Sequence, residues 1–238
     1  MDAGGAPVVD LLTGRVVGSA ESSTLGAVTS PDGSAQAWQV DSAVRVTRAG
    51  DVAAHPLPAP ACTFVDWADD ASLLVDCPAL DPSTLRASGG VGAATVLLDA
   101  TTGQIQDVRH LDADTLRPVR PSARTDDGRL VTVLQAARTD DSGGAADAPC
   151  GIALGVVTGL ESTVLAEVPG RGLSYPGLTT VPGRLLALGG AACDGGPYAS
   201  ALWSVDTGTG EVTTLIAPPA DETTTNPPRG LLDAVPGD

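Results

Sequence analysis

The chain has 238 residues, of which 42% are hydrophobic and 18% charged, which suits one large domain and is too polar for a membrane bundle. Acidic residues number 29 against 13 Lys and Arg, all of them Arg, so the formal net charge is -16. This charge repels phosphate backbones and anionic lipid headgroups, which excludes nucleic acid as a general partner. No stretch approaches the roughly 18 to 20 apolar residues of a spanning helix, so we expect no membrane insertion by this chain.

One phrase recurs along the chain: an apolar strand, a turn with Thr-Gly or a near relative, and a second strand. Its copies lie at residues 8–17, 95–108, 152–165 and 201–215, with a degenerate copy at 44–52. Glycine adopts positive φ without steric cost, so we expect that conformation at the turn glycines. These are Gly14, Gly50, Gly103, Gly159 and Gly208.

A second phrase, a strand followed by a polar turn and another strand, interleaves with the first at 24–40, 63–77, 116–136 and 173–189. Together the phrases predict four-stranded units near residues 23–57, 61–111, 116–168 and 173–217. Units of about 40 to 50 residues with four strands each are typical of propeller blades. The predicted fold class is therefore all-β, a β-propeller of four-stranded blades.

The two ends of the chain predict an incomplete blade. Residues 7–20 would supply the two outer strands of a split blade. The Pro/Thr-rich segment 218–238 holds one apolar run, Leu231–Val235, and therefore one closing strand at best. We expect about five repeat units within 1–217, one of them split or incomplete, and a natural product that extends upstream of Met1. The alternative is an open arc cut from a larger propeller.

The turn chemistry carries a resemblance to a known family. Ser30-Pro31-Asp32-Gly33, followed half a blade later by a hairpin of the Asp-x-x-Thr-Gly type, resembles the TolB-like, WD-repeat-like β-propellers of bacterial envelopes. Because these motifs are turns, the resemblance implies the fold rather than a function. Ser-Pro-Asp-Gly is intact in the first unit alone, and aromatic residues make up 3% of the chain. The large core residues should be Trp38, Phe64, Trp67 and Trp203.

The four cysteines predict two disulfides. A hairpin over 61–77 that turns at Asp69 and Asp70 brings Cys62 opposite Cys77. Cys150 and Cys193 both fall in connections between the second and third strands of adjacent blades, on one face of the propeller. Two such pairs favour an oxidising, extracytoplasmic compartment, with any signal or anchor outside this chain. The alternative is four unrelated buried thiols.

Motifs for catalysis, metals and cofactors are weak, so we predict none of these sites. No Gly-x-Ser-x-Gly elbow is present, and His55 and His110 are expected to be solvent-facing or partly packed. Glycine clusters lack a following helix or a Walker lysine. Acidic pairs are interpreted as turn caps, with a calcium site as the alternative. These pairs are Asp69-Asp70, Asp126-Asp127, Asp140-Asp141, and Asp112 with Asp114.

Two insertions indicate a binding face. Residues 78–94 and 138–149 connect second to third strands, and long loops on a rigid scaffold are usually functional or disordered. By loop position, the contact residues would be Arg86, Asp194 and Tyr198. We expect a monomeric, non-enzymatic extracytoplasmic propeller that acts as a binding or scaffold domain for a protein, peptide or glycan. The alternatives are a secreted enzyme or enzyme subunit with an acidic site on this face, and the sensor ectodomain of an anchored protein.

Overall fold

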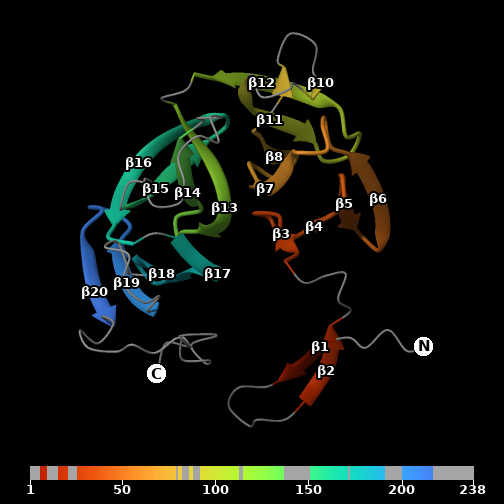
Figure 1. Cartoon of the computed structure of the whole chain (residues 1–238). Helices are drawn as coiled ribbons and strands as arrows, with labels where there is room; N and C mark the ends of the chain where they lie inside the picture. The colour runs from red at the N-terminus through yellow and green to blue at the C-terminus, as the bar shows by residue number, and fades with distance from the viewer. Residues whose placement is uncertain are drawn as a thin grey trace.

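The protein folds into four sheets of four antiparallel strands each, as a computed structural model shows (Figure 1). The structure describes residues 6–9, 16–20, 26–78, 80–81, 86–87, 92–112, 115–136, 151–170, 172–190 and 200–216. All regular elements among them are strands, which confirms the predicted all-β, blade-built fold class. Across these residues we find no helix with the length and hydropathy to cross a membrane.

Each sheet is a meander in which strands consecutive in the blade pair with one another. Blade 1 holds β3 (Val28–Thr29), β4 (Ala35–Val40), β5 (Ala43–Arg48) and β6 (Asp51–Pro56). Blade 2 holds β7 (Thr63–Trp67), β8 (Ser72–Cys77), β11 (Ala93–Asp99) and β12 (Ile105–Leu111). Blade 3 holds β13 (Leu116–Arg124), β14 (Leu130–Ala136), β15 (Ile152–Thr158) and β16 (Glu161–Val168). Blade 4 holds β17 (Gly172–Val181), β18 (Arg184–Gly190), β19 (Ser200–Asp206) and β20 (Val212–Ile216).

Two short hairpins stand outside the blades. β1 (Ala6–Val9) pairs with β2 (Val16–Ala20), and Figure 1 shows this hairpin apart from the four-stranded sheets. β9 (Leu80–Asp81) pairs with β10 (Arg86–Ala87) inside the insertion of blade 2. The segment proposed to close the split blade, 218–238, lies outside the described residues, so closure stays a prediction.

Two apolar cores hold the blades together in pairs. The 1–2 core joins alternate residues of β4 and β5, such as Ala37 and Val44, to blade 2. The 3–4 core joins Val133 and Leu154 of blade 3 to blade 4. Small and β-branched side chains fill both cores, because a strand places alternate residues on one face and the sheets pack face to face.

The few aromatic residues fill these cores unevenly. Phe64 and Trp67 are fully buried in the 1–2 core, and Trp203 is buried in the 3–4 core, as predicted. The Trp67 indole N–H also donates to the Val28 carbonyl oxygen at 2.9 Å, which ties the inner strand of blade 1 to blade 2. Trp38 is buried as predicted, at 8% exposed, although it belongs to neither of the two apolar cores.

The Asp-x-x-Thr-Gly turns of blades 2 and 4 have the same structure. In blade 4 the Asp206 carboxylate accepts hydrogen bonds from the backbone N–H groups of Gly208 and Thr209, as Asp99 does in blade 2. The residue at positive φ in this turn is Gly210, at 76°. The prediction of Gly208 was wrong, because the positive-φ glycine lies two residues further along the chain. The segment Asp-Thr-Gly-Thr-Gly offers two glycines, and the capping Asp206 decides which one ends the turn.

Of the other predicted turn glycines, Gly50, Gly103 and Gly159 have positive φ, and Gly14 lies outside the described residues. Gly103 and Gly210 also approach the preceding blade closely. A Cβ atom at Gly103 would lie 2.6 Å from His55 Nδ1 of β6, and one at Gly210 would collide with the Leu165 carbonyl oxygen of β16. These turns therefore need glycine for two independent reasons.

The two glycines of the blade 4 turn give a matched test. Gly210→Ala should lower the free energy of unfolding by about 2 kcal/mol or more, because φ is positive and the new Cβ meets backbone. Gly208→Ala should change it by less than about 0.5 kcal/mol. Its Cβ would lie 3.5 Å from Asp206 Oδ1, and Thr101 occupies the equivalent place in blade 2. Urea denaturation of both variants measures the difference, and equal costs would contradict this account of the turn.

Candidate binding surface

The connections between strands divide the propeller into two faces. The turns that join first to second and third to fourth strands are short, and we call their side the turn face. The connections from second to third strand emerge on the opposite side, which we call the loop face. They cover residues 41–42 in blade 1, 78–92 in blade 2, 137–151 in blade 3 and 191–199 in blade 4. The long connections therefore lie on one face of a rigid scaffold, and such loops are where propellers build binding sites.

A disulfide lies at the base of the loop face. Cys62 and Cys77 are bonded, with their Cα atoms 4.2 Å apart, and both side chains are buried. The pairs Thr63 with Asp76 and Phe64 with Val75 give the register from which the bond was predicted. The register shifts by one residue between Phe64 and Asp66, a bulge that the sequence did not indicate. Since Cys77 directly precedes the insertion 78–92, the bond holds the root of that loop.

A buried ion pair lies beside this root and crosses from blade 2 to blade 3. Arg117 of β13 contacts the Asp76 carboxylate of β8, whose side chain is 6% exposed, and donates to Gln135 Oε1 at 3.2 Å. Burial raises the pKa of Asp76 to about 6, although Arg117 acts in the opposite direction. Asp76 Oδ1 and the hydroxyl of its cross-strand partner Thr95 find no hydrogen-bond partner among the described residues.

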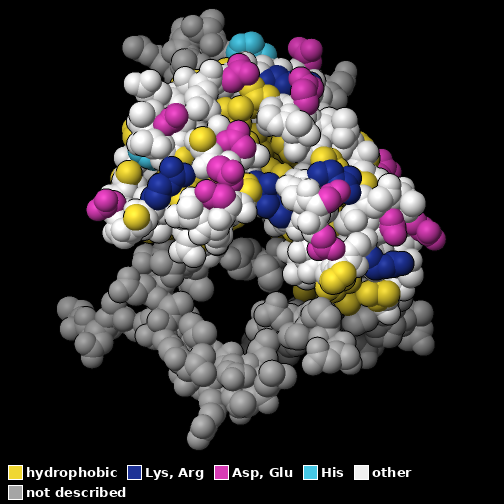
Figure 2. Space-filling view, turned by 180° about the vertical axis from the view of Figure 1, so that it is seen from behind, with side chains coloured by type: hydrophobic (Ala, Val, Ile, Leu, Met, Phe, Trp, Pro, Cys, Tyr) yellow, Lys and Arg dark blue, Asp and Glu magenta, His cyan; other side chains and the backbone are white. Residues whose placement is uncertain are grey.

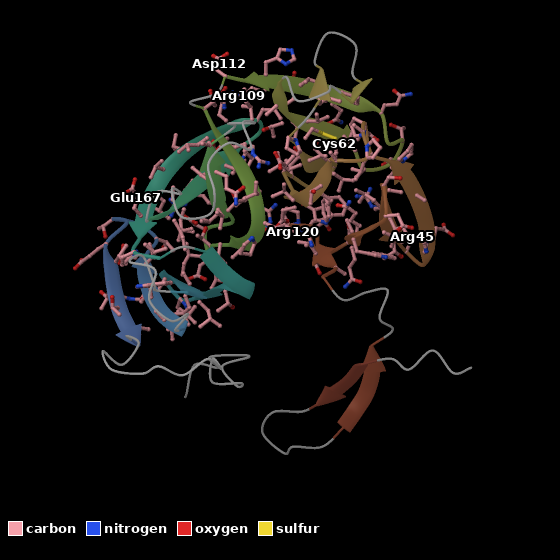
Figure 3. All side chains as sticks on the ribbon, in the orientation of Figure 1. Arg45, Cys62, Arg109, Asp112, Arg120 and Glu167 are labelled. Carbon is pink, nitrogen blue, oxygen red and sulfur yellow. A yellow bond between two sulfur atoms is a disulfide. The ribbon has the colours of Figure 1, made fainter. Side chains whose placement is uncertain are left out.

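A second buried carboxylate crosses the same boundary nearer the turn face. Asp66 of β7 accepts hydrogen bonds from Ser122 Oγ of β13 and from the Trp67 backbone N–H, each at 2.6 Å, and lies 4.0 Å from Arg124. Burial raises the pKa of Asp66, and the hydrogen bond from Ser122 lowers it. Arg120 donates to the Val65 carbonyl oxygen at 3.1 Å and reaches inward from β13 (Figure 3).

These groups make a polar joint between blades 2 and 3, and we define the polar joint by Asp66, Asp76, Arg117, Ser122 and Arg124. Its apolar contact is smaller than either core and consists of Val65, Leu74, Leu130, Val157 and Leu160. Buried ion pairs pay a desolvation cost that can exceed their Coulombic attraction. The two blade pairs are thus joined by contacts whose strength depends on the protonation of two carboxylates.

Carboxylates on the turn face are satisfied within the fold. The Ser30 hydroxyl and the Ser34 backbone N–H donate to Asp32, which lowers the pKa of Asp32 to about 2. Hydrogen bonds from Thr102, Thr125 and Thr209 lower the pKa of Asp99, Asp127 and Asp206 in turn.

Two further turn-face carboxylates link neighbouring blades. Asp70 accepts from the Asp32 backbone N–H, and Asp126 accepts from the Gly183 backbone N–H. Acidic side chains spread over the view in Figure 2, with arginines between them. The turn-face carboxylates therefore cap turns and link neighbouring blades. Within the described ranges, no three His, Cys, Asp or Glu side chains gather to hold a metal.

Two of the three residues predicted for binding, Asp194 and Tyr198, lie outside the described part of the chain. The cysteines of the predicted second disulfide, Cys150 and Cys193, lie outside it as well. Arg86 lies on the loop face in β10, where its backbone pairs with Asp81 of β9. Its placement in the loop agrees with the prediction, while its role in binding is untested.

Sequence reasoning missed the polar joint and misjudged one histidine. His55 is buried, and its Nε2 lies 3.0 Å from the Ala100 carbonyl oxygen, because β6 packs against the turn of blade 2. One signal for the joint was present: Arg117, Arg120 and Arg124 fall in a single inner strand of a chain with 13 Lys and Arg.

Comparison with known proteins supplies likenesses of fold. No family model and no curated protein matches the chain. The chain resembles a puromycin-hydrolyzing peptidase from Mycobacterium tuberculosis, with a TM-score of 0.49 and 22% identity over 84% of this chain and 30% of that one. For a TolB-like protein from Agrobacterium tumefaciens the TM-score is 0.45, with 15% identity over 80% and 61%. For the β-propeller domain of the Trilobed protease from Pyrococcus furiosus it is 0.40, with 10% identity over 79% and 55%.

The chain thus spans less than two thirds of the length of each of these proteins. Identities this low speak to fold alone, and the assignment as a β-propeller rests on the four sheets themselves. What the chain binds has to be argued from its own residues.

Asp76→Asn should remove a pH dependence of stability. The folded-state pKa of about 6 exceeds the ordinary value of 3.8, so the folded protein gains stability below pH 4 that it loses as the pH rises through 6. This difference is worth about 3 kcal/mol at most. Asn keeps an oxygen for Arg117 without the charge, so the variant should be at least as stable as the parent at pH 7.5 and should lose that advantage at pH 4.

Guanidinium denaturation at several pH values measures this effect, and Asp99→Asn is the matched control. Hydrogen bonds lower the pKa of Asp99, so its stabilising effect is present above the ordinary pKa and is lost in acid. The Asp99 variant should therefore be less stable than the parent at pH 7.5, and the difference should shrink as the pH falls below the ordinary pKa of 3.8. An Asp76→Asn variant that is less stable than the parent at pH 7.5 would show that the ion pair is net favourable.

Proposed function

We propose that the chain is an extracytoplasmic binding or scaffold propeller whose loop face takes a protein, peptide or glycan partner. The observation that carries the proposal is the asymmetry of its connections. Three of the four connections between second and third strands are long, whereas the turns on the opposite face are short and internally hydrogen-bonded. Long connections on one face alone are typical of scaffolds that present variable loops to a ligand.

The root of the blade 2 insertion is held in place, which favours binding. The Cys62–Cys77 bond fixes one end of the insertion of blade 2, and Arg117 joins the neighbouring Asp76 to the inner strand of blade 3. A loop with anchored ends loses less conformational freedom when it meets a partner, so more of its contact energy appears as affinity. Within these loops, Arg86, Asp194 and Tyr198 are the proposed contact residues.

The disulfide supports the proposed compartment. A buried bond between Cys62 and Cys77 persists in oxidising surroundings and is rare in the cytoplasm. The proposed second bond, Cys150 with Cys193, would link the loops of blades 3 and 4 on the same face. A scaffold exported to the envelope and a sensor ectodomain share this arrangement and differ in what anchors them.

Deletion within either insertion should weaken partner binding while leaving the fold intact. Peptides selected from a displayed random library against the parent protein are the probe, and residues 82–91 or 140–147 are the segments to delete. Loop length enters closure entropy logarithmically, so the melting temperature should stay within about 3 °C. Affinity for most selected peptides should fall by about tenfold or more.

Val164→Ser is the control for these deletions, because Val164 is an exposed apolar residue on the outer strand of blade 3. It should leave every selected peptide bound as tightly as the parent binds it. If both deletion variants retain parental affinity for all selected peptides, the loop face is not the binding surface.

The disulfides should be detectable and should stabilise the fold. Peptide mapping without reduction, after expression in an oxidising compartment, should show Cys62 joined to Cys77 and Cys150 joined to Cys193. The double variant Cys62→Ser, Cys77→Ser should lose about 3 kcal/mol of unfolding free energy in the chain-entropy account. Four free thiols, or a bridge from Cys62 to Cys150 or Cys193, would contradict the compartment assignment.

A further inference from the structure

A crevice of about 390 Å³ opens on the turn face between blades 1 and 2. Its volume falls within the range of sites that hold small molecules and single side chains. The lining comes from the outer strands of blade 1 and from the turn between β11 and β12 of blade 2. These residues are Val46, Arg48, Ala49, Asp51, Val52, Ala53, Ala100 and Thr101.

The crevice exists because small side chains stand where the 1–2 core ends. Val46 and Ala53 are cross-strand partners, and Val46 belongs to that core. Two residues further along β6, His55 bridges to the Ala100 carbonyl oxygen at 3.0 Å and joins the two blades. Toward the turn face, Ala53 and Ala100 are too small to bridge the same distance. The apolar gap between the two blades therefore stays open at Ala53 and Ala100, next to the point where His55 closes it.

The exposed start of β6 borders this gap at the surface. Val52 is 59% exposed, the highest value among the large hydrophobic residues of the described chain. Its neighbours Asp51, Ala53 and Ala54 are exposed as well. Ala53, on the same face of β6 as His55, therefore offers exposed apolar surface to an entering group, whereas the side chain of Val52 lies on the opposite face with that of Ala54.

Carboxylates surround the crevice and select the charge of what enters it. Asp51 lines it, and Asp99 caps the turn that carries Thr101. Asp70 lies beside Arg48, whose guanidinium donates to the Asp70 carbonyl oxygen, and Asp70 also accepts from the Asp32 backbone N–H. Asp51 lines the crevice together with its cross-strand partner Arg48, and Asp32, Asp70 and Asp99 lie in neighbouring turns of a chain of net charge -16. Cationic groups are attracted to this rim and anionic groups are repelled.

We propose that this crevice is the docking site for a short basic segment of a partner protein. One aliphatic or aromatic side chain of that segment enters between Val46, Ala53 and Ala100. Arginine or lysine residues on either side of it lie against Asp51 and Asp99. The site is on the face opposite the long loops, so it is a second surface that does not depend on the loop-face proposal.

Three capped peptides of matched length test the chemistry of this site. Their central triplets are Arg-Leu-Arg, Arg-Ser-Arg and Glu-Leu-Glu, and calorimetry measures their affinity for the full chain. The first should bind saturably, and the second should bind about tenfold more weakly because it lacks the apolar side chain. The third should not bind. Affinity for the first should fall as salt rises from about 50 to about 500 mM.

Two neighbouring alanines give matched variants for the same experiment. Ala53→Phe fills the crevice and should weaken the Arg-Leu-Arg peptide about tenfold, whereas Ala54→Phe, paired with Arg45 on the other side of the sheet, should leave it unchanged. Asp51→Lys, on the exposed rim, should weaken it without disturbing the fold. Equal affinity in the Ala53 and Ala54 variants, equal binding of the leucine and serine peptides, or tighter binding of the acidic peptide would each overturn the proposal.

Discussion

The fold depends on how each sheet buries a face against the next one, because a propeller has no other interior. With 3% aromatic residues, this chain fills two of its three described interfaces by packing Val, Leu and Ala around Phe64, Trp67 and Trp203. The interface between blades 2 and 3 has a smaller apolar contact and also holds Asp66 and Asp76. Removing carboxylates from water is costly, and the arginines of β13 offset that cost only in part, as the raised pKa values show. We therefore expect the stability of this interface to depend on pH.

Aspartates in the turns have lowered pKa values, in contrast to the two aspartates of the polar joint. Asp32, Asp99, Asp127 and Asp206 accept hydrogen bonds from adjacent backbone or hydroxyl donors, so ionisation is favoured and their pKa values fall. Part of the acidity of the chain thus comes from closing tight turns with aspartate. A negative surface of this origin still steers cations toward the molecule. That effect matters where an apolar opening lies among the carboxylates, as it does between blades 1 and 2.

Local patterns predicted the parts of this structure that depend on local chemistry. Strand and turn repeats gave the four-stranded sheets, and a hairpin register gave Cys62 opposite Cys77. Gly208 was chosen over Gly210 because a two-glycine turn is ambiguous until its capping aspartate is placed. The polar joint escaped prediction since Asp66 and Ser122 meet only when two blades are docked. The crevice escaped for a different reason: it is made by alanines that are too small, and a missing volume leaves no motif.

The two proposed surfaces lie differently with respect to the polar joint between blades 2 and 3. A ligand in the crevice touches blades 1 and 2 only, which share one apolar core, so its affinity should not depend on the protonation of Asp76. A partner that engages both 78–92 and 137–151 spans blades 2 and 3 and holds the polar joint closed. By linkage, a closed joint that favours the protonated Asp76 also makes such a partner bind more tightly as the pH falls toward 5. A rise in affinity between pH 7.5 and pH 5 would therefore favour the loop face as the surface that a given partner occupies.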